Sequence, residues 1–209
     1  EAAMGGDLCA KTGYDPVDFD ASTLATAVAD CDSVVLMSYA TDGAAIVEEL
    51  ATQGYTGSMF GADGIADAGF IAEFSDTAAL NGLVATKPNA GDAPMAALFD
   101  ALWAMNGGPE GAIYTHEAAD ATMILAMAAA TTMMMQAEGQ TDFTIVDGIE
   151  MMTAYEPFEG ASGMHVFDAN GDVGGSGYEV CSFDDEAGVT VFSCSATWTQ
   201  EDGLADNAA

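Results

Sequence analysis

The chain has 209 residues, of which 50% are hydrophobic, and its 34 acids against two lysines give a net charge of −32. This apolar content is typical of a folded protein and excludes a disordered acidic tail. The charge excludes nucleic acid and anionic membrane surfaces as partners, because both are polyanions. It also indicates saline surroundings, since dissolved ions screen the repulsion between carboxylates.

Helix and strand patterns alternate from the N-terminus. Asp20 is expected to cap a first helix. The apolar run 33–39 then predicts a parallel strand that is covered on both faces. Asp42 is expected to cap the next helix, and Gly54 to end it.

Two more strands are predicted at 58–61 and 81–86, with a short helix at 70–74 between them. This β-α-β-α-β order predicts the α/β class, with an open parallel sheet flanked by helices. The stretch 87–92 contains proline and glycine and is expected to be a linker.

Helical periodicity dominates the middle of the chain. Helices are predicted at 95–102, 115–137 and 142–152. The apolar stretch Ala118–Met135 reads as a buried helix rather than a membrane span, because it is rich in alanine and threonine and contains Asp120. The C-terminal part then changes to glycine-rich turns and short strands.

The four cysteines allow three disulfide connectivities. No CxxC pair is present, which argues against a zinc knuckle. Cys181 and Cys194 flank a predicted hairpin and are expected to form a disulfide, with buried free thiols as the alternative. The pairing of Cys9 with Cys31 stays open.

Motifs of catalysis and metal binding are incomplete in this sequence. His116 and Glu117 lack the second histidine of a zinc-protease motif and read as a solvated pair at a helix start. There is no Gly-x-Ser-x-Gly elbow. The glycine-rich stretch 171–177 lacks the lysine of a phosphate loop, and 168–172 reads as a turn rather than a calcium loop. The sequence therefore predicts no enzyme, no metal and no cofactor.

Tyr39 and Asp63 are the remaining site candidates. Each follows one of two predicted neighbouring strands, and ligands of open parallel sheets bind beyond the carboxyl ends of the strands. The alternative is a tyrosine that covers the sheet and an aspartate that is simply solvated.

Three stretches, 32–64, 117–130 and 155–180, together resemble one known family. In order and spacing they look like the C-terminal part of type I periplasmic solute-binding proteins of ABC transporters, the branched-chain amino acid binding proteins. The resemblance implies two α/β lobes that close on a small ligand about hinges, here near 87–92 and 168–177. In amino-acid-binding members, residues at the places of Tyr39 and Asp63 contact the ligand's ammonium group. Glutamate often stands where this chain has Asp63.

The resemblance also implies a fragment that lacks most of the N-terminal lobe. Residues 1–88 and 177–200 would form the C-terminal ligand-binding lobe, 89–176 the rest of the first lobe with the hinge crossings, and 201–209 a tail. Helices between Asp92 and Met152 would then expose an apolar face.

The function implied is the substrate-binding component of an ABC-type amino acid uptake system. It would be periplasmic or extracytoplasmic and monomeric when full length. Its partners would be a small-molecule ligand, namely an amino acid of the branched-chain type or a related small polar ligand, and an ABC permease in the membrane. The alternative is a ligand-sensing domain of a receptor or regulator with the same fold, because fold alone does not separate the two.

Overall fold

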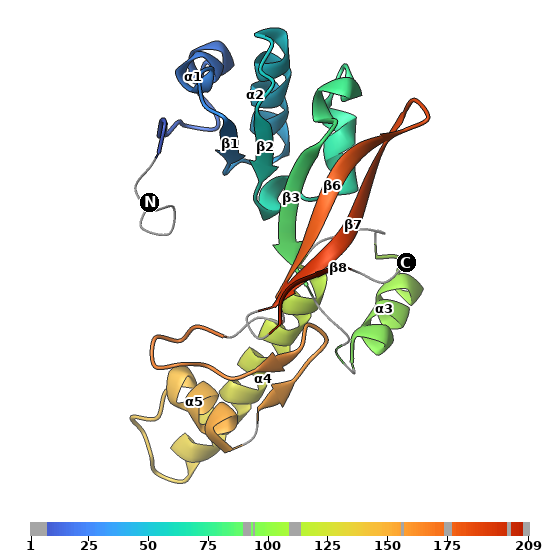
Figure 1. Ribbon diagram of the computed structural model, residues 1–209. Helices are drawn as coiled ribbons and strands as arrows, with labels where there is room; N and C mark the ends of the chain where they lie inside the picture. The colour runs from blue at the N-terminus through green and yellow to red at the C-terminus, as the bar shows by residue number, and fades with distance from the viewer. Residues whose placement is uncertain are drawn as a thin grey trace. The chain divides into compact units, whose positions relative to one another are not determined.

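A computed structural model describes residues 8–89, 93, 95–108, 114–155, 157–173, 177–199 and 202–206 (Figure 1). The chain divides into two compact units. The first unit comprises residues 1–87, 179–198 and 204–209, and the second comprises 88–178 and 199–203. Each unit is described by itself.

The sheet has the strand order β1-β2-β3-β6-β7-β8. Its strands are β1 Ser33–Leu36, β2 Ser58–Gly61, β3 Leu83–Pro88, β6 Tyr178–Glu186, β7 Val189–Thr199 and β8 Gly203–Asp206. The first three strands are parallel, as predicted. Figure 1 shows β6 and β7 as a long hairpin beside β3, closed by Ala187 and Gly188 at φ of 56° and 88°. Positive φ at both turn positions matches the right-handed twist of the paired strands.

The described residues of the first unit also form two α-helices and three short 3₁₀ helices. They are α1 Ala21–Val28, α2 Ala40–Thr52, η2 Asp63–Ile65, η3 Ala68–Glu73 and η4 Thr77–Leu80. Asp20 caps α1 by accepting hydrogen bonds from the N–H groups of Ser22 and Thr23, as predicted. The open, mainly parallel sheet flanked by helices that the sequence predicted is thus confirmed.

The core of the first unit is almost wholly apolar. Its largest fully buried side chains are Phe70, Phe183, Leu50, Ile65, Leu80, Leu83 and Val47. They come from α2, the 3₁₀ helices and strands β3 and β6, so one apolar cluster joins the helices to the sheet. Burial of such side chains is the main source of stability in this unit.

Two expectations around β1 are wrong. The strand ends at Leu36 rather than at residue 39, and one of its faces is open, with Val35 49% exposed. β1 is the first strand of the sheet order, and its burial alternates along the strand. Helix α2 begins at Ala40, so Tyr39 is the N-cap residue, and Asp42 takes part in the capping from the third helical position by accepting from the N–H of Tyr39.

The linker expected at 87–92 is also partly wrong. Lys87 and Pro88 are the last two residues of β3, so the strand continues into the stretch where proline predicted a linker. Residues 90–92 lie outside the described part of the chain.

In the part of the second unit that the structure describes, the chain forms three helices and a small hairpin. They are α3 Ala96–Met105, α4 Thr115–Ala137, α5 Ile145–Tyr155, β4 Phe158–Glu159 and β5 Met164–His165. α4 packs on α5, where a Cβ at Gly148 would stand only 2.8 Å from the carbonyl oxygen of Ala128. Glycine is therefore needed for the two helices to approach this closely.

Helix α4 is not the buried helix that the sequence predicted. Its buried positions form a single row at i, i+4 spacing, namely Asp120, Ile124, Ala128 and Thr132. Apolar side chains on its other faces are open, such as Met133, which is 72% exposed. By length and composition alone α4 could cross a membrane, which is weak evidence, since helices of globular units pass the same test.

Candidate functional site

Tyr39 and Asp63 follow two adjacent parallel strands. The register pairs Leu36 with Gly61 at the carboxyl ends of β1 and β2, and the N–H of Ala62 donates to the carbonyl of Leu36 at 3.1 Å. Tyr39 then leads into α2, and Asp63 begins η2. Both residues therefore lie at the edge of the sheet where ligands of this fold class bind.

Gly64 brings these two strand ends into contact. A Cβ on Gly64 would stand 2.4 Å from the carbonyl oxygen of Ser38 and 3.3 Å from Cδ1 of Tyr39. The tyrosine ring therefore lies beside the residue that follows Asp63, and a side chain at position 64 would push the segments apart. Sequence reasoning placed Asp63 after a strand but missed this contact of Gly64.

The exposed groups at this edge suit a positively charged ligand group. The Tyr39 side chain is 74% exposed, and Asp63 is partly exposed. A carboxylate accepts hydrogen bonds from an ammonium group, and the charge strengthens them. A phenol oxygen can accept as well.

A second tyrosine, Tyr14, is linked to Tyr39 through Asp42, and the sequence analysis did not predict this link. The hydroxyl of Tyr14 donates to Oδ2 of Asp42, and the N–H of Tyr39 donates to Oδ1 of the same carboxylate at 3.1 Å. Asp42 is only 6% exposed. Burial, followed by the hydrogen bond to Asp42 and its negative charge, raises the pKa of Tyr14. No local pattern links Tyr14 to Asp42, so only the tertiary structure reveals the pair.

The second unit holds a buried carboxylate cluster that the sequence did not predict. Asp120 on α4 accepts hydrogen bonds from the N–H groups of Ala161 and Ser162 and from the Ser162 hydroxyl, each at 2.7 Å. Its Oδ2 lies 3.0 Å from Nε2 of His165. Burial raises the pKa of Asp120, but the hydrogen bonds from Ser162, Ala161 and His165 outweigh it and hold the pKa below its usual value.

This Asp120 cluster lacks the geometry of a nucleophile triad. In a triad, the histidine contacts the serine through one nitrogen and the acid through the other. Here Nε2 of His165 contacts both, lying 3.1 Å from the Ser162 hydroxyl and 3.0 Å from Asp120. The serine proton is directed at the carboxylate, so the arrangement fixes the loop after β4 and activates no nucleophile. A Cβ at Gly160 would stand 2.3 Å from the carboxylate carbon, so glycine is required there.

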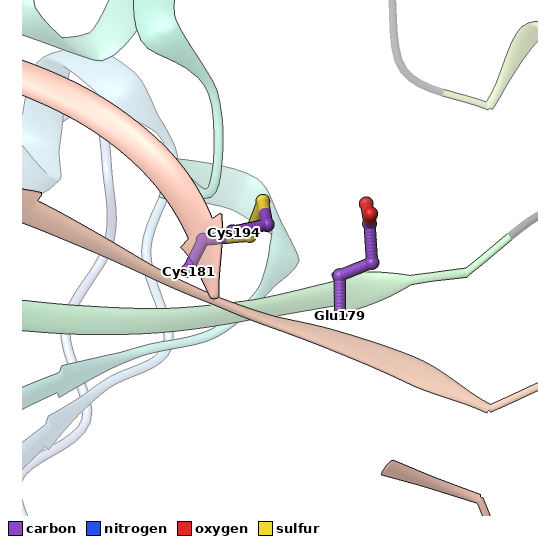
Figure 2. Close-up of side chains that lie close together, drawn as sticks. All are labelled: Glu179, Cys181 and Cys194. Atoms are coloured by element: carbon purple, nitrogen blue, oxygen red, sulfur yellow. A yellow bond between two sulfur atoms is a disulfide. The ribbon is translucent and has the colours of Figure 1, made fainter. Parts of the chain in front are cut away.

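Glu179, Cys181 and Cys194 are close enough to suggest a metal site (Figure 2). The two cysteines are joined by a disulfide, the pair expected from the sequence, and Cys9 is joined to Cys31. Metal binding requires thiolates, which a disulfide does not offer. The Glu179 carboxylate instead pairs with the ammonium of Lys87 at 3.1 Å. This group therefore does not fit a metal ion while the disulfide is present.

Two other sequence motifs also have structural explanations. His116 does not form a solvated pair with Glu117; its Nε2 lies 2.9 Å from the carboxylate of Asp100, and its ring lies 4.7 Å from that of Phe99. It therefore joins α3 to α4. In the turn 168–172, Oδ1 of Asp168 accepts from two N–H groups of its own loop, as expected for a turn.

Comparisons with known proteins identify the fold. No protein-family model and no curated protein matches the sequence. Among solved structures, a leucine-binding protein, LivK, from Thermotoga maritima is similar over 88% of this chain and 50% of its own, with 24% identity and a TM-score of 0.65.

Two further similar structures were solved with amino acids. An ABC transporter substrate-binding protein from Desulfitobacterium hafniense, in complex with Leu, matches 84% of this chain and 49% of its own, at 18% identity and a TM-score of 0.54. LivJ from Streptococcus pneumoniae is a branched-chain amino acid transporter substrate-binding protein, solved in complex with isoleucine. It matches 86% of this chain and 49% of its own, also at 18% identity and a TM-score of 0.54. The chain thus has the fold of type I periplasmic binding proteins and spans about half of their length.

Proposed function

We propose that this chain is part of the substrate-binding component of an ABC-type amino acid uptake system. The observation that carries the proposal is the placement of Tyr39 and Asp63 at adjacent strand ends in contact through Gly64. The fold supports it, because similar structures include proteins solved with leucine or isoleucine. Fold similarity at this identity supports the class of protein only.

In this proposal the carboxylate of Asp63 and the hydroxyl of Tyr39 bind the ammonium group of the ligand. The ligand is an amino acid of the branched-chain type or a related small polar ligand. The protein acts outside the cytoplasm as a monomer and delivers the ligand to a membrane permease. It catalyses no reaction, in keeping with the geometry of the Asp120 cluster.

The decisive experiment measures ligand affinity in the full-length protein that the gene encodes. L-leucine and L-isoleucine are titrated by calorimetry into the wild type and Asp63→Asn. Loss of the charged acceptor should weaken binding roughly tenfold to a hundredfold. Asp76→Asn is the matched control, because Asp76 caps η4, which precedes β3 and so lies toward the amino ends of the parallel strands. Unchanged affinity in Asp63→Asn would contradict the proposed role of this carboxylate.

A further inference from the structure

Asp42 is a buried carboxylate whose burial the capping of α2 does not explain. It is 6% exposed, and it accepts hydrogen bonds from the hydroxyl of Tyr14 and the N–H of Tyr39. Removing a carboxylate from water is costly unless hydrogen bonds compensate. Helix α1 is capped at no such cost, because Asp20 is exposed. Asp42 takes part in the capping box of α2, and its buried position points to a role in addition to capping.

The two oxygens of Asp42 connect Tyr39 to a separate segment of the chain. Oδ1 accepts from Tyr39 and Oδ2 from Tyr14. Tyr14 is itself restrained, since its ring packs on Phe19 with the ring centroids 5.3 Å apart. The segment that carries it is tied to the residues before β1 by the disulfide between Cys9 and Cys31.

Tyr39 depends on its backbone for its position. Its side chain is 74% exposed, so packing contributes little to holding the ring in place. The backbone N–H of Tyr39 is held by Asp42, while Gly64 lies close to Cδ1 of the Tyr39 ring and to the carbonyl of Ser38. A shift of either would move the phenol hydroxyl relative to Asp63.

We propose that Asp42 is a positioning residue, and that Tyr14 holds its carboxylate so that Tyr39 is presented to the ligand in one orientation. The inference rests on the proposed function, because it assumes that Tyr39 contacts the ligand. It adds two residues, Asp42 and the sequence-distant Tyr14, that set the affinity without touching the ligand. A preorganised site loses less entropy on binding, so fixing Tyr39 strengthens binding.

The test combines a probe of Tyr39 with a binding measurement. The full-length protein is labelled with 3-fluorotyrosine, and the ¹⁹F NMR signal of Tyr39 is assigned by its loss in Tyr39→Phe. Asp42→Ala and Tyr14→Phe should each shift or broaden the Tyr39 signal. Asp42→Ala should also weaken L-leucine binding severalfold to about tenfold, because Tyr39 would then have to be ordered when the ligand binds. Asp42→Asn should retain most of the wild-type Tyr39 signal and most of the affinity for L-leucine, because its amide oxygen can still accept from the N–H of Tyr39.

Asp20→Ala is the matched control, since it removes a helix cap without touching Tyr39. It should lower the melting temperature but leave the Tyr39 signal and the affinity unchanged. An unchanged Tyr39 signal in Asp42→Ala and Tyr14→Phe would overturn the inference. If Asp42→Ala does not fold, Tyr14→Phe decides alone, because it removes a single hydroxyl. If the signal moves while Tyr39→Ala binds L-leucine normally, the positioning stands and the proposed ligand contact fails.

Discussion

Each of the two units is stabilised by a different kind of interaction in its interior. Phe70, Phe183 and Leu50 belong to a contiguous apolar cluster in the first unit, each at most 1% exposed. The buried positions of the second unit include a carboxylate, Asp120, and the hydroxyl of Ser162. The first unit therefore depends mainly on apolar packing, although it also buries the carboxylate of Asp42. The described part of the second unit buries few apolar side chains and depends more on a hydrogen-bond cluster between α4 and the loop after β4.

The apolar core makes the first unit the better support for a ligand site. A packed apolar core holds the strands rigidly, so residues at the strand ends keep fixed positions. The second unit exposes apolar side chains on α3 and α4, such as Met105 at 83% and Met133 at 72%. A candidate ligand site is better supported on the first unit, where Tyr39 and Asp63 follow strands that pack on this core.

The largest effect is expected from emptying the core of the first unit. Phe70→Ala removes a ring that is 1% exposed and contacts the ring of Phe183 at 5.7 Å between centroids. The cavity should cost about 4 kcal/mol of unfolding free energy. Denaturant unfolding measures the loss, and Val17→Ala, at a side chain 91% exposed, is the control. A loss in Phe70→Ala no greater than that in the control would refute the packed core.

A slightly smaller loss is expected from Asp120→Ala, and it should be confined to the second unit. The substitution leaves the buried N–H groups of Ala161 and Ser162 without their acceptor, which should cost about 3 kcal/mol. Hydrogen exchange resolved by segment should show faster exchange in α4 and β5 than in β2. The control is Asp147→Ala, which removes only the exposed cap at the start of α5 and should cost about 1 kcal/mol. Equal acceleration in both units would contradict two separate means of stabilisation.

Removal of the disulfide between Cys9 and Cys31 should have a smaller effect, again on the first unit. The bond closes a loop with a sequence separation of 22, and its loss in the paired cysteine-to-serine variant should cost about 2 kcal/mol. This cost is at the low end of the range for loss of a native disulfide, because Tyr14 still anchors the segment through Asp42. Thermal unfolding measures the loss. Combination with Tyr14→Phe should cost more than the sum of the two single changes.

Sequence reasoning predicted the elements of this fold better than their burial. The period of apolar residues located α4, and the Asp20 cap located α1, because both signals are local. The open face of β1 was missed because a continuous apolar run does not say which strand is at the edge. At the candidate site, strand order indicated Tyr39 and Asp63, whereas Tyr14 carries no signal that relates it to Asp42.

The smallest effect is expected from a change of pH, which should destabilise the second unit relative to the first without any substitution. The hydrogen bonds hold the pKa of Asp120 below the ordinary value of 3.8 that it regains on unfolding. A depressed pKa in the folded state means that the stabilisation is fully present above 3.8 and is lost as the pH falls through the folded pKa.

Acid should therefore speed hydrogen exchange in α4 and β5 relative to β2, after correction for intrinsic rates. The change should be smaller than in Asp120→Ala, because protonation leaves the side chain in place and able to accept hydrogen bonds. Asp120→Asn is the control, since it cannot titrate and should lose this pH dependence. If it keeps the same acid response, groups other than Asp120 open the second unit, and the contrast between an apolar core and a carboxylate cluster does not explain acid sensitivity.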